Sequence, residues 1–181
     1  PERLARASDF DPLTFDSDEQ GNIMVVWLDG TEIRSRVYDR AQDRWLPEAL
    51  VATTTADAIL GKPDLTSGSA ILYFKTPAPN PGTWAAIYEA GVGWVQASTV
   101  QLDEESGDLV AVSMDEAGNA LVVWNFDVRH RRYLREGGWQ AAASFVSISV
   151  TSNTLWAAAA PDGTVLVVAN DFGWPWAIRF E

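Results

Sequence analysis

The apolar positions of this chain gather in four short, dense runs. Each run is six residues long, contains β-branched side chains, and is apolar at both alternating sets of positions. A segment so short and so evenly apolar is typical of a β-strand buried on both faces, and it lacks the period of an amphipathic helix. The runs are residues 22–27, 69–74, 119–124 and 164–169.

A glycine comes directly before each run and makes the runs a repeat. The glycines are Gly21, Gly68, Gly118 and Gly163, which are 47, 50 and 45 residues apart. An acidic residue shortly before a glycine is typical of a hairpin turn, in which the glycine takes a positive φ. We therefore expect Gly118 to have a positive φ.

Further signals extend each repeat on both sides of the run. A strand is expected before each turn, for example over residues 109–113 and 155–159. An aromatic residue follows each run, and in the first three repeats a tryptophan comes six or seven residues after it. These aromatic residues are Tyr38, Tyr88, Tyr133 and Phe180, and the tryptophans are Trp45, Trp94 and Trp139.

These signals predict an all-β protein whose repeats of about 47 residues are four-stranded antiparallel meanders. No stretch has a convincing helical period, so no helix longer than about two turns is expected. Four-stranded meanders that recur at this spacing are typical of β-propeller blades.

The repeats predict one propeller domain, or a propeller fragment, over residues 1–181. Its repeats are approximately residues 10–57, 58–105, 106–152 and 153–181, the last without a fourth strand of its own. Residues 1–9 have the length of that missing strand and are expected to pair with strand 177–180. The count fits a four-bladed ring closed in this way, half of an eight-bladed ring, or a piece of a longer propeller.

Charge and composition exclude several functions. The net charge of −12 disfavours nucleic acid and anionic lipid as partners. The longest apolar run, residues 154–160, is too short for membrane insertion. The chain has no cysteine and a single histidine, which removes thiolate chemistry and most zinc chemistry. No cofactor is expected.

Two repeats carry a motif that resembles a known group of propellers. The motif consists of Asp-x-x-Gly-Asn, a later Val-Trp, an arginine near a tyrosine, and Gly-Trp. It matches best over residues 16–45 and 113–139. This pattern resembles the blades of bacterial extracellular and lipoprotein-type β-propeller repeat proteins. The resemblance implies a secreted, cell-surface or periplasmic location and no particular ligand. Because Pro1 is not a start residue, we expect a mature or trimmed form.

Two clusters of charged residues invite a functional interpretation. Asp16 and Asp18 begin a segment like a calcium loop, but the twelfth position is Trp27 and not a carboxylate, so a hairpin turn is favoured over a metal site. Arg129, Arg131 and Arg135 share one strand face and could hold an anion. In so acidic a protein we expect them to pair with acidic neighbours instead.

The tryptophans separate into core and candidate binding residues. Trp27, Trp45, Trp94, Trp124 and Trp139 recur from repeat to repeat and are expected in the core. Three others fall in or just after the connections between the second and third strands, where variable loops on a rigid scaffold normally bind ligands. The candidate binding residues are Trp84, Trp174, Trp176, Asp171, Asn80 and Phe126.

Three functions follow from these residues. The leading hypothesis is a non-catalytic module that binds a protein partner, or a second copy of itself, through this loop face. The alternative is a carbohydrate-binding lectin that uses the loop tryptophans. A glycoside hydrolase or lyase is the third, and no group of residues supports catalysis, so we expect no enzyme.

The predicted pairing of the termini can be tested by truncation. If residues 2–8 pair with strand 177–180, removal of residues 1–9 should lower the melting temperature sharply or cause association, because a sheet edge would lose its partner. Thermal denaturation and sedimentation of the truncated chain measure both effects. Fast amide exchange across both segments in the intact chain would contradict the pairing.

Overall fold

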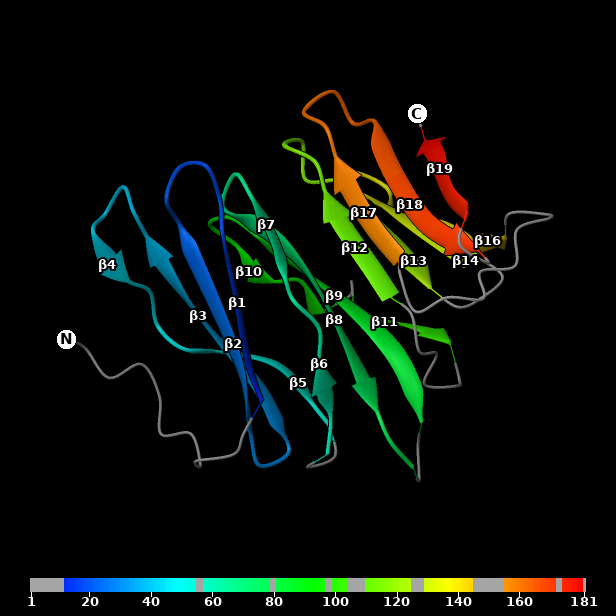
Figure 1. The fold of residues 1–181 in the computed structure, drawn as a ribbon. Helices are drawn as coiled ribbons and strands as arrows, with labels where there is room; N and C mark the ends of the chain where they lie inside the picture. The colour runs from blue at the N-terminus through cyan, green and yellow to red at the C-terminus, as the bar shows by residue number, and fades with distance from the viewer. Residues whose placement is uncertain are drawn as a thin grey trace. The chain divides into compact units, whose positions relative to one another are not determined.

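Antiparallel β-strands make up the protein wherever the structure describes it. The computed structural model describes residues 12–54, 57–78, 81–96, 99–103, 110–124, 129–144, 155–171 and 174–180. Within these ranges the single helical position is Gln96. The predicted all-β, antiparallel fold is confirmed. The strands form four sheets in chain order (Figure 1), in two compact units, residues 1–106 and 107–181.

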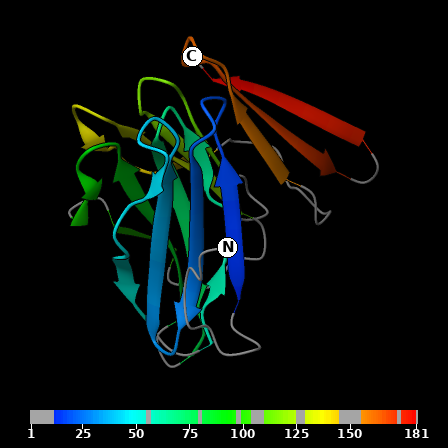
Figure 2. The ribbon, with the colours of Figure 1, turned by 90° about the vertical axis from the view of Figure 1, so that its left-hand side faces the viewer.

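Unit 1 contains two sheets. Sheet 1 consists of β1 (Leu13–Ser17), β2 (Ile23–Asp29), β3 (Glu32–Asp39), β4 (Arg44–Trp45) and β5 (Ala49–Thr53). Sheet 2 consists of β6 (Ile59–Leu60), β7 (Asp64–Thr66), β8 (Ser69–Thr76), β9 (Gly82–Glu89), β10 (Gly93–Trp94) and β11 (Val100–Asp103). The strands of sheet 1, blue and cyan in Figure 2, run side by side in the order β1-β2-β3.

Unit 2 also contains two sheets. Sheet 3 consists of β12 (Val110–Met114), β13 (Ala120–Trp124), β14 (Arg129–Leu134), β15 (Gly138–Trp139) and β16 (Ala143–Ser144). Sheet 4 consists of β17 (Leu155–Ala159), β18 (Val165–Asp171) and β19 (Trp174–Phe180). Both sheets keep chain order, so each is a meander.

The repeat that the glycines predict is present in the backbone. Gly21, Gly68, Gly118 and Gly163 have φ values of +83°, +76°, +83° and +84°, which confirms the expectation for Gly118. Each apolar run forms the strand that follows its turn glycine, and the aromatic pairs recur in the first three sheets. Tyr38 lies opposite Trp45, Tyr88 opposite Trp94 and Tyr133 opposite Trp139, with ring centroids 5.4–5.5 Å apart.

In the first repeat the aspartate of the turn, Asp18, is the acceptor that holds the turn together. Asp18 Oδ1 accepts hydrogen bonds from the N–H groups of Gln20 and Asn22, at 3.0 and 2.8 Å. Asp18 Oδ2 accepts from Asn22 Nδ2 at 2.7 Å and from the N–H of Gly68, the turn glycine of the next repeat, at 2.8 Å. One carboxylate therefore closes its own turn and fixes the neighbouring one.

The asparagine after the turn glycine ties the turn to the third strand. Asn22 Oδ1 accepts from the N–H of Arg40 at 3.0 Å, and Asn119 Oδ1 accepts from the N–H of Arg135 at 3.2 Å. In the second repeat, where the motif is degenerate, the hydroxyl of Ser69 accepts from Ala90 at 3.2 Å. The substitution changes the side chain and keeps the hydrogen bond.

The outer strand of the first three meanders differs from the expectation. We expected four strands in each of the first three repeats, whereas sheets 1 to 3 have five, six and five, and the last repeat has the three strands expected of its own segment. The outer strand is split: β4 and β5 pair with β3, β10 and β11 with β9, and β15 and β16 with β14. In sheets 1 and 3 an arginine of the third strand takes a carbonyl at the break. Arg36 Nε donates to Leu46 O at 2.9 Å, and Arg131 Nε to Gln140 O at 2.7 Å.

The two faces of each sheet follow a fixed rule. We call the face with the second, fourth and sixth residues after the turn glycine the even face, and the other the odd face. In unit 1 the odd face of sheet 1 packs on the even face of sheet 2, and in unit 2 sheets 3 and 4 pack in the same way. The paired sets are Met24, Val26 and Leu28 with Ala70, Leu72 and Phe74, and Leu121 and Val123 with Val165, Val167 and Ala169.

The repeated tryptophans are core residues only in part. Trp27 and Trp124 are buried as expected. Trp45, Trp94 and Trp139, also expected in the core, lie on the split outer strand and are half-buried, and of these Trp94 packs against the core of unit 1. Residues 1–9 and their expected pairing with β19 lie outside the described residues, so closure of a ring stays a prediction.

A pair of glycine substitutions tests the turn. Gly118→Ala should lower the free energy of unfolding by about 1 kcal/mol or more, because φ is +83° and a Cβ would lie 3.3 Å from Arg135 Cδ. Gly137→Ala is the control, since its Cβ would meet only ordinary contacts of 3.5 Å and above. Urea unfolding of both variants gives the comparison. Equal stability of the two would contradict the repeat alignment.

Candidate functional site

A pocket of about 360 Å³ lies between sheets 1 and 2 of unit 1. Its volume is in the range of small-ligand sites. Sheet 1 contributes the end of β5 and the residue after it, and sheet 2 contributes β8, β9 and the residue before β11. The lining residues are Ala52, Thr53, Thr54, Phe74, Thr76, Trp84 and Thr99.

Trp84 provides the largest apolar surface of the pocket. Its ring lies parallel to that of Phe74, with an interplanar angle of 8° and centroids 6.4 Å apart. Trp84 Nε1 donates to Thr76 Oγ1 at 3.2 Å, and Thr76 Oγ1 in turn donates to Gly82 O at 3.4 Å. The indole is therefore held from both its ring face and its polar edge, which fixes its orientation.

Hydroxyl groups surround this aromatic surface. Four of the seven lining residues are threonines: Thr53, Thr54, Thr76 and Thr99. A hydroxyl can both donate and accept a hydrogen bond, and a threonine side chain carries no charge. The seven lining residues include no charged side chain. The pocket therefore suits an uncharged ligand that has an apolar face and several polar groups.

The structure brings one of the predicted binding residues into this pocket. Trp84 lines it, at the start of β9 and just after the connection that the sequence singled out. Trp176 is on β19 in unit 2 and 48% exposed. Asp171 and Trp174 pair with each other in the β18–β19 hairpin, and their side chains are outside the description. Asn80 and Phe126 lie outside the described residues.

The threonines of the pocket escaped the sequence analysis. Threonine is a common strand residue, so Thr76 and Thr99 give no signal of their own. Thr53 pairs with Glu32 of β3 at the end of β5, which is also an ordinary strand position. Their convergence with Trp84 depends on the packing of sheet 1 on sheet 2.

The carboxylates of Asp16 and Asp18, the calcium candidates, are bound by nitrogen donors of the protein. Both oxygens of Asp18 accept hydrogen bonds within and beyond its turn, as described above. Asp16 Oδ1 forms an ion pair with Lys62 Nζ at 2.8 Å, and Asp16 Oδ2 accepts from the N–H of Leu65 at 3.0 Å. A cation would have to displace these donors, which favours the hairpin-turn interpretation. Among the described residues, no three His, Asp or Glu side chains are grouped to hold a metal ion.

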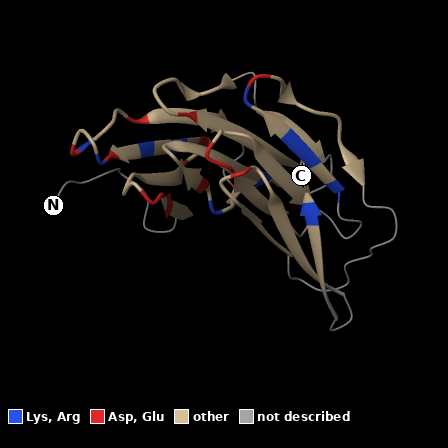
Figure 3. Cartoon of the chain, turned by 90° about the horizontal axis from the view of Figure 1, so that it is seen from above, with Lys and Arg blue, Asp and Glu red and all other residues tan. Residues whose placement is uncertain are grey.

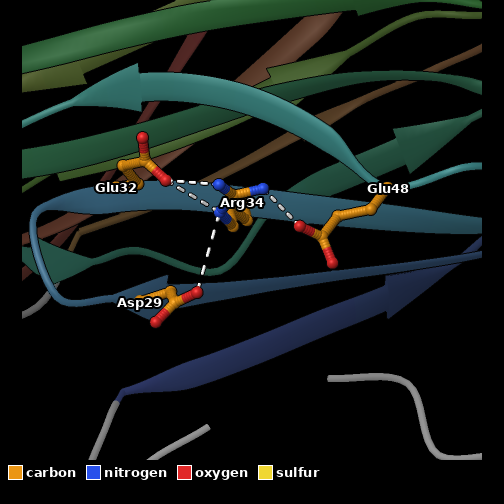
Figure 4. A network of polar contacts seen from close by, with 4 residues as sticks. All are labelled: Asp29, Glu32, Arg34 and Glu48. Atoms are coloured by element: carbon orange, nitrogen blue, oxygen red, sulfur yellow. Dashed lines mark hydrogen bonds and ion pairs between the residues drawn. The ribbon is translucent and has the colours of Figure 1, made fainter. Parts of the chain in front are cut away.

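The arginines of β3 and β14 have structural partners. Arg34 forms ion pairs with Glu32 and Glu48 and lies 3.8 Å from Asp29 (Figure 4). The hydrogen bonds to the two glutamates raise the pKa of Arg34 above its usual value. Arg131, one of the anion candidates, lies 5.8 Å from the ring centroid of Trp139, just as Arg36 lies 6.0 Å from Trp45. This repetition indicates a packing role for Arg131.

The single histidine also packs against an aromatic ring. His130 contacts Phe180, with ring centroids 5.1 Å apart. Burial, and secondarily the charge of Arg132, lowers the pKa of His130 below its ordinary value. The neutral imidazole is therefore favoured in the folded protein.

Comparison with known proteins gives structural matches only. No protein-family model matches the sequence, and no curated protein matches it. Among solved structures, AofleA from Arthrobotrys oligospora matches at 18% identity and a TM-score of 0.57, over 94% of this chain and 53% of that one. The fungal lectin of Aleuria aurantia, described as a six-bladed β-propeller with a fucose recognition mode, matches at 16% identity and 0.53, over 88% and 56%.

A third match is hydrazine synthase of Kuenenia stuttgartiensis, at 13% identity and a TM-score of 0.58, over 92% of this chain and 58% of that one. By its match to the six-bladed propeller, the fold of this chain is that of a β-propeller. This chain spans a little over half the length of each of these structures. The propeller part of the resemblance drawn from the sequence is supported, and its assignment to bacterial lipoprotein-type propellers stays a prediction. Among the described residues, no helix is long and apolar enough to cross a membrane.

The hairpin-turn interpretation of Asp18 predicts a loss of stability without the side chain. Asp18→Ala should lower the free energy of unfolding by at least about 2 kcal/mol, because four donors lose a charged acceptor. Asp57→Ala, at an exposed turn position, is the control. Excess calcium or a chelator should leave the melting temperature of the unaltered chain unchanged. A calcium-dependent rise that Asp18→Ala abolishes would show a metal site instead.

Proposed function

We propose that this chain is a non-catalytic carbohydrate-binding module and that the pocket beside Trp84 holds one neutral sugar ring. The observation that carries the proposal is the lining itself, in which an oriented indole is surrounded by four threonines. A sugar ring has an apolar C–H face that packs on an aromatic side chain, and its hydroxyls bond to side-chain hydroxyls. The pocket offers both surfaces within one site.

Charge favours a neutral sugar over an acidic one. The chain has a net charge of −12, and Figure 3 shows that acidic residues gather at the turns of the molecule. The lining residues provide no cation that could offset a carboxylate or phosphate of the ligand. An acidic sugar would therefore be desolvated without a partner, which costs free energy.

The comparisons support the same class of ligand. Structures of the Aleuria aurantia lectin are in complex with Fucα1-6GlcNAc and with α-methyl-L-fucoside, and both match this chain at 14% identity and a TM-score of 0.55. L-Fucose is therefore the first sugar to test. The protein-partner hypothesis for the loop face has no comparable support. A glycan ligand would fit a secreted, cell-surface or periplasmic location, which stays part of the proposal.

Titration calorimetry with α-methyl-L-fucoside and a panel of neutral methyl glycosides tests the proposal. The unaltered chain should bind at least one of them, and Trp84→Ala should weaken binding by at least about tenfold, which corresponds to about 1.4 kcal/mol. Trp176→Ala is the matched control, because it removes an exposed indole of unit 2. Absence of binding across the panel, or a loss caused only by Trp176→Ala, would contradict the proposed site.

A second substitution separates ligand contact from folding. Thr53→Val keeps the side-chain volume and removes the hydroxyl, so it should weaken sugar binding about fivefold while the melting temperature stays the same. Thr31→Val is the control, since Thr31 is exposed in the β2–β3 turn and does not line the pocket. Equal affinities of the two variants would show that the hydroxyl of Thr53 makes no contact with the sugar.

A further inference from the structure

The apolar run of sheet 4 is buried on one face only. In the first three repeats the central residues of the run are buried at consecutive positions, Met24–Leu28, Ser69–Leu72 and Ala120–Trp124. In β18 burial alternates: Val165, Val167 and Ala169 are buried, whereas Leu166 is 45% exposed and Val168 is half-buried. The sequence predicts burial of both faces for all four runs, so the odd face of sheet 4 lacks a cover among the described residues.

A large aromatic residue extends this exposed face. Trp156 of β17 lies opposite Val168, and Ala158 lies opposite Leu166, so both belong to the odd face. Trp156 is 61% exposed, and Ala158 and Ala177 are exposed beside it. An exposed tryptophan within a contiguous apolar sheet face is a mark of an interaction surface.

On the even face of sheet 1, apolar residues are exposed along β1 and at β5, whereas Val25 and Trp27 of β2 are buried. Leu13 and Phe15 lie opposite Trp27 and Val25, on the even face, and are 57% and 61% exposed. Leu50 is on the same face, opposite Arg34, and is 43% exposed. In sheet 4 the equivalent positions of β17 are Leu155 and Ala157, and there they pack into the core of unit 2 against sheet 3.

The contacts inside each unit show what such faces bind. In both units an odd face packs on the even face of the next sheet, with β12 against β17 at the inner strands of unit 2. Sheet 4 presents an exposed odd face, and sheet 1 presents the exposed even-face residues Leu13, Phe15 and Leu50. We propose that the odd face of sheet 4 binds the even face of sheet 1 of a second copy of this chain, in the same manner as the contacts within each unit.

The equivalence also predicts which side chains would meet. Trp156 would pack on Leu13 and Phe15, as the inner strands of sheets 3 and 4 pack in unit 2. Val37 of sheet 1 and Tyr88 of sheet 2 lie in one core cluster of unit 1. By position in the repeat, Arg179 of sheet 4 is equivalent to Val37, and Tyr38 of sheet 1 is equivalent to Tyr88. The exposed Arg179 would therefore lie beside Tyr38, whose hydroxyl is bonded to the carboxylate of Asp43. This places opposite charges at the rim of the apolar contact.

The contact joins two different surfaces, so it is heterologous. Such a contact closes into a ring when the rotation between copies allows it, and otherwise continues into an open series. Either form uses the same pair of faces. The proposal is independent of sugar binding, because the lining of the pocket beside Trp84 includes none of Trp156, Leu13, Phe15 and Leu50.

Sedimentation equilibrium of the chain, with a mass of 19.8 kDa, tests the contact. The unaltered chain should form a complex of two or more copies. Trp156→Glu and Phe15→Glu should each reduce the mass to that of one copy while the thermal transition is kept, since both side chains are exposed in the single copy. Val92→Glu, at a 72% exposed position in the turn between β9 and β10, should leave the association unchanged.

Mixing the two altered chains distinguishes a heterologous contact from a symmetric one. Trp156→Glu keeps an intact sheet 1, and Phe15→Glu keeps an intact sheet 4, so an equimolar mixture should form a species of two copies. An unaltered chain that stays a single copy would overturn the proposal. That is the result expected if another protein, or the chain's own terminal residues, covers these faces. Self-association of either altered chain alone, or a mixture that stays single, would overturn it as well.

Discussion

One carboxylate in each of two turns holds much of the architecture. Asp18 accepts four hydrogen bonds, three within its own turn and one from Gly68 of the next repeat. In unit 2 the buried Asp115 bonds Asn119 in the same way, and its Oδ2 lies where a Cβ on Gly163 would be only 3.3 Å away. In unit 1 the neighbouring turns are therefore joined by a hydrogen bond, and in unit 2 they lie in close contact.

Much of this fold could be predicted because the turn and the strand each leave a local signal. Glycine with positive φ and a run of β-branched residues need no distant partner to be recognised. The split of the outer strand could not be predicted. In sheets 1 and 3 the break is accompanied by hydrogen bonds from Arg36 and Arg131 to carbonyls ten and nine residues away, and arginine at those positions is equally typical of an exposed strand.

The candidate site was predictable only at its most conspicuous residue. Trp84 interrupts the repeat pattern, whereas the threonines around it are ordinary strand residues that converge by the packing of two sheets. Sequence analysis also assigned all recurring tryptophans to the core. Trp45 and Trp139 are instead half-buried, and an arginine side chain packs over the ring of each. This role depends on the path of the outer strand at the edge of the sheet.

The broken outer strand has a consequence for solubility. A long, regular strand at the edge of a sheet offers a row of free backbone groups on which strands of other molecules can assemble into fibrils. In sheets 1 to 3 the outer positions are taken by segments of two to five residues, and arginine side chains occupy carbonyls at the breaks in sheets 1 and 3. These three sheets thereby present little continuous template for amyloid growth at their outer edges.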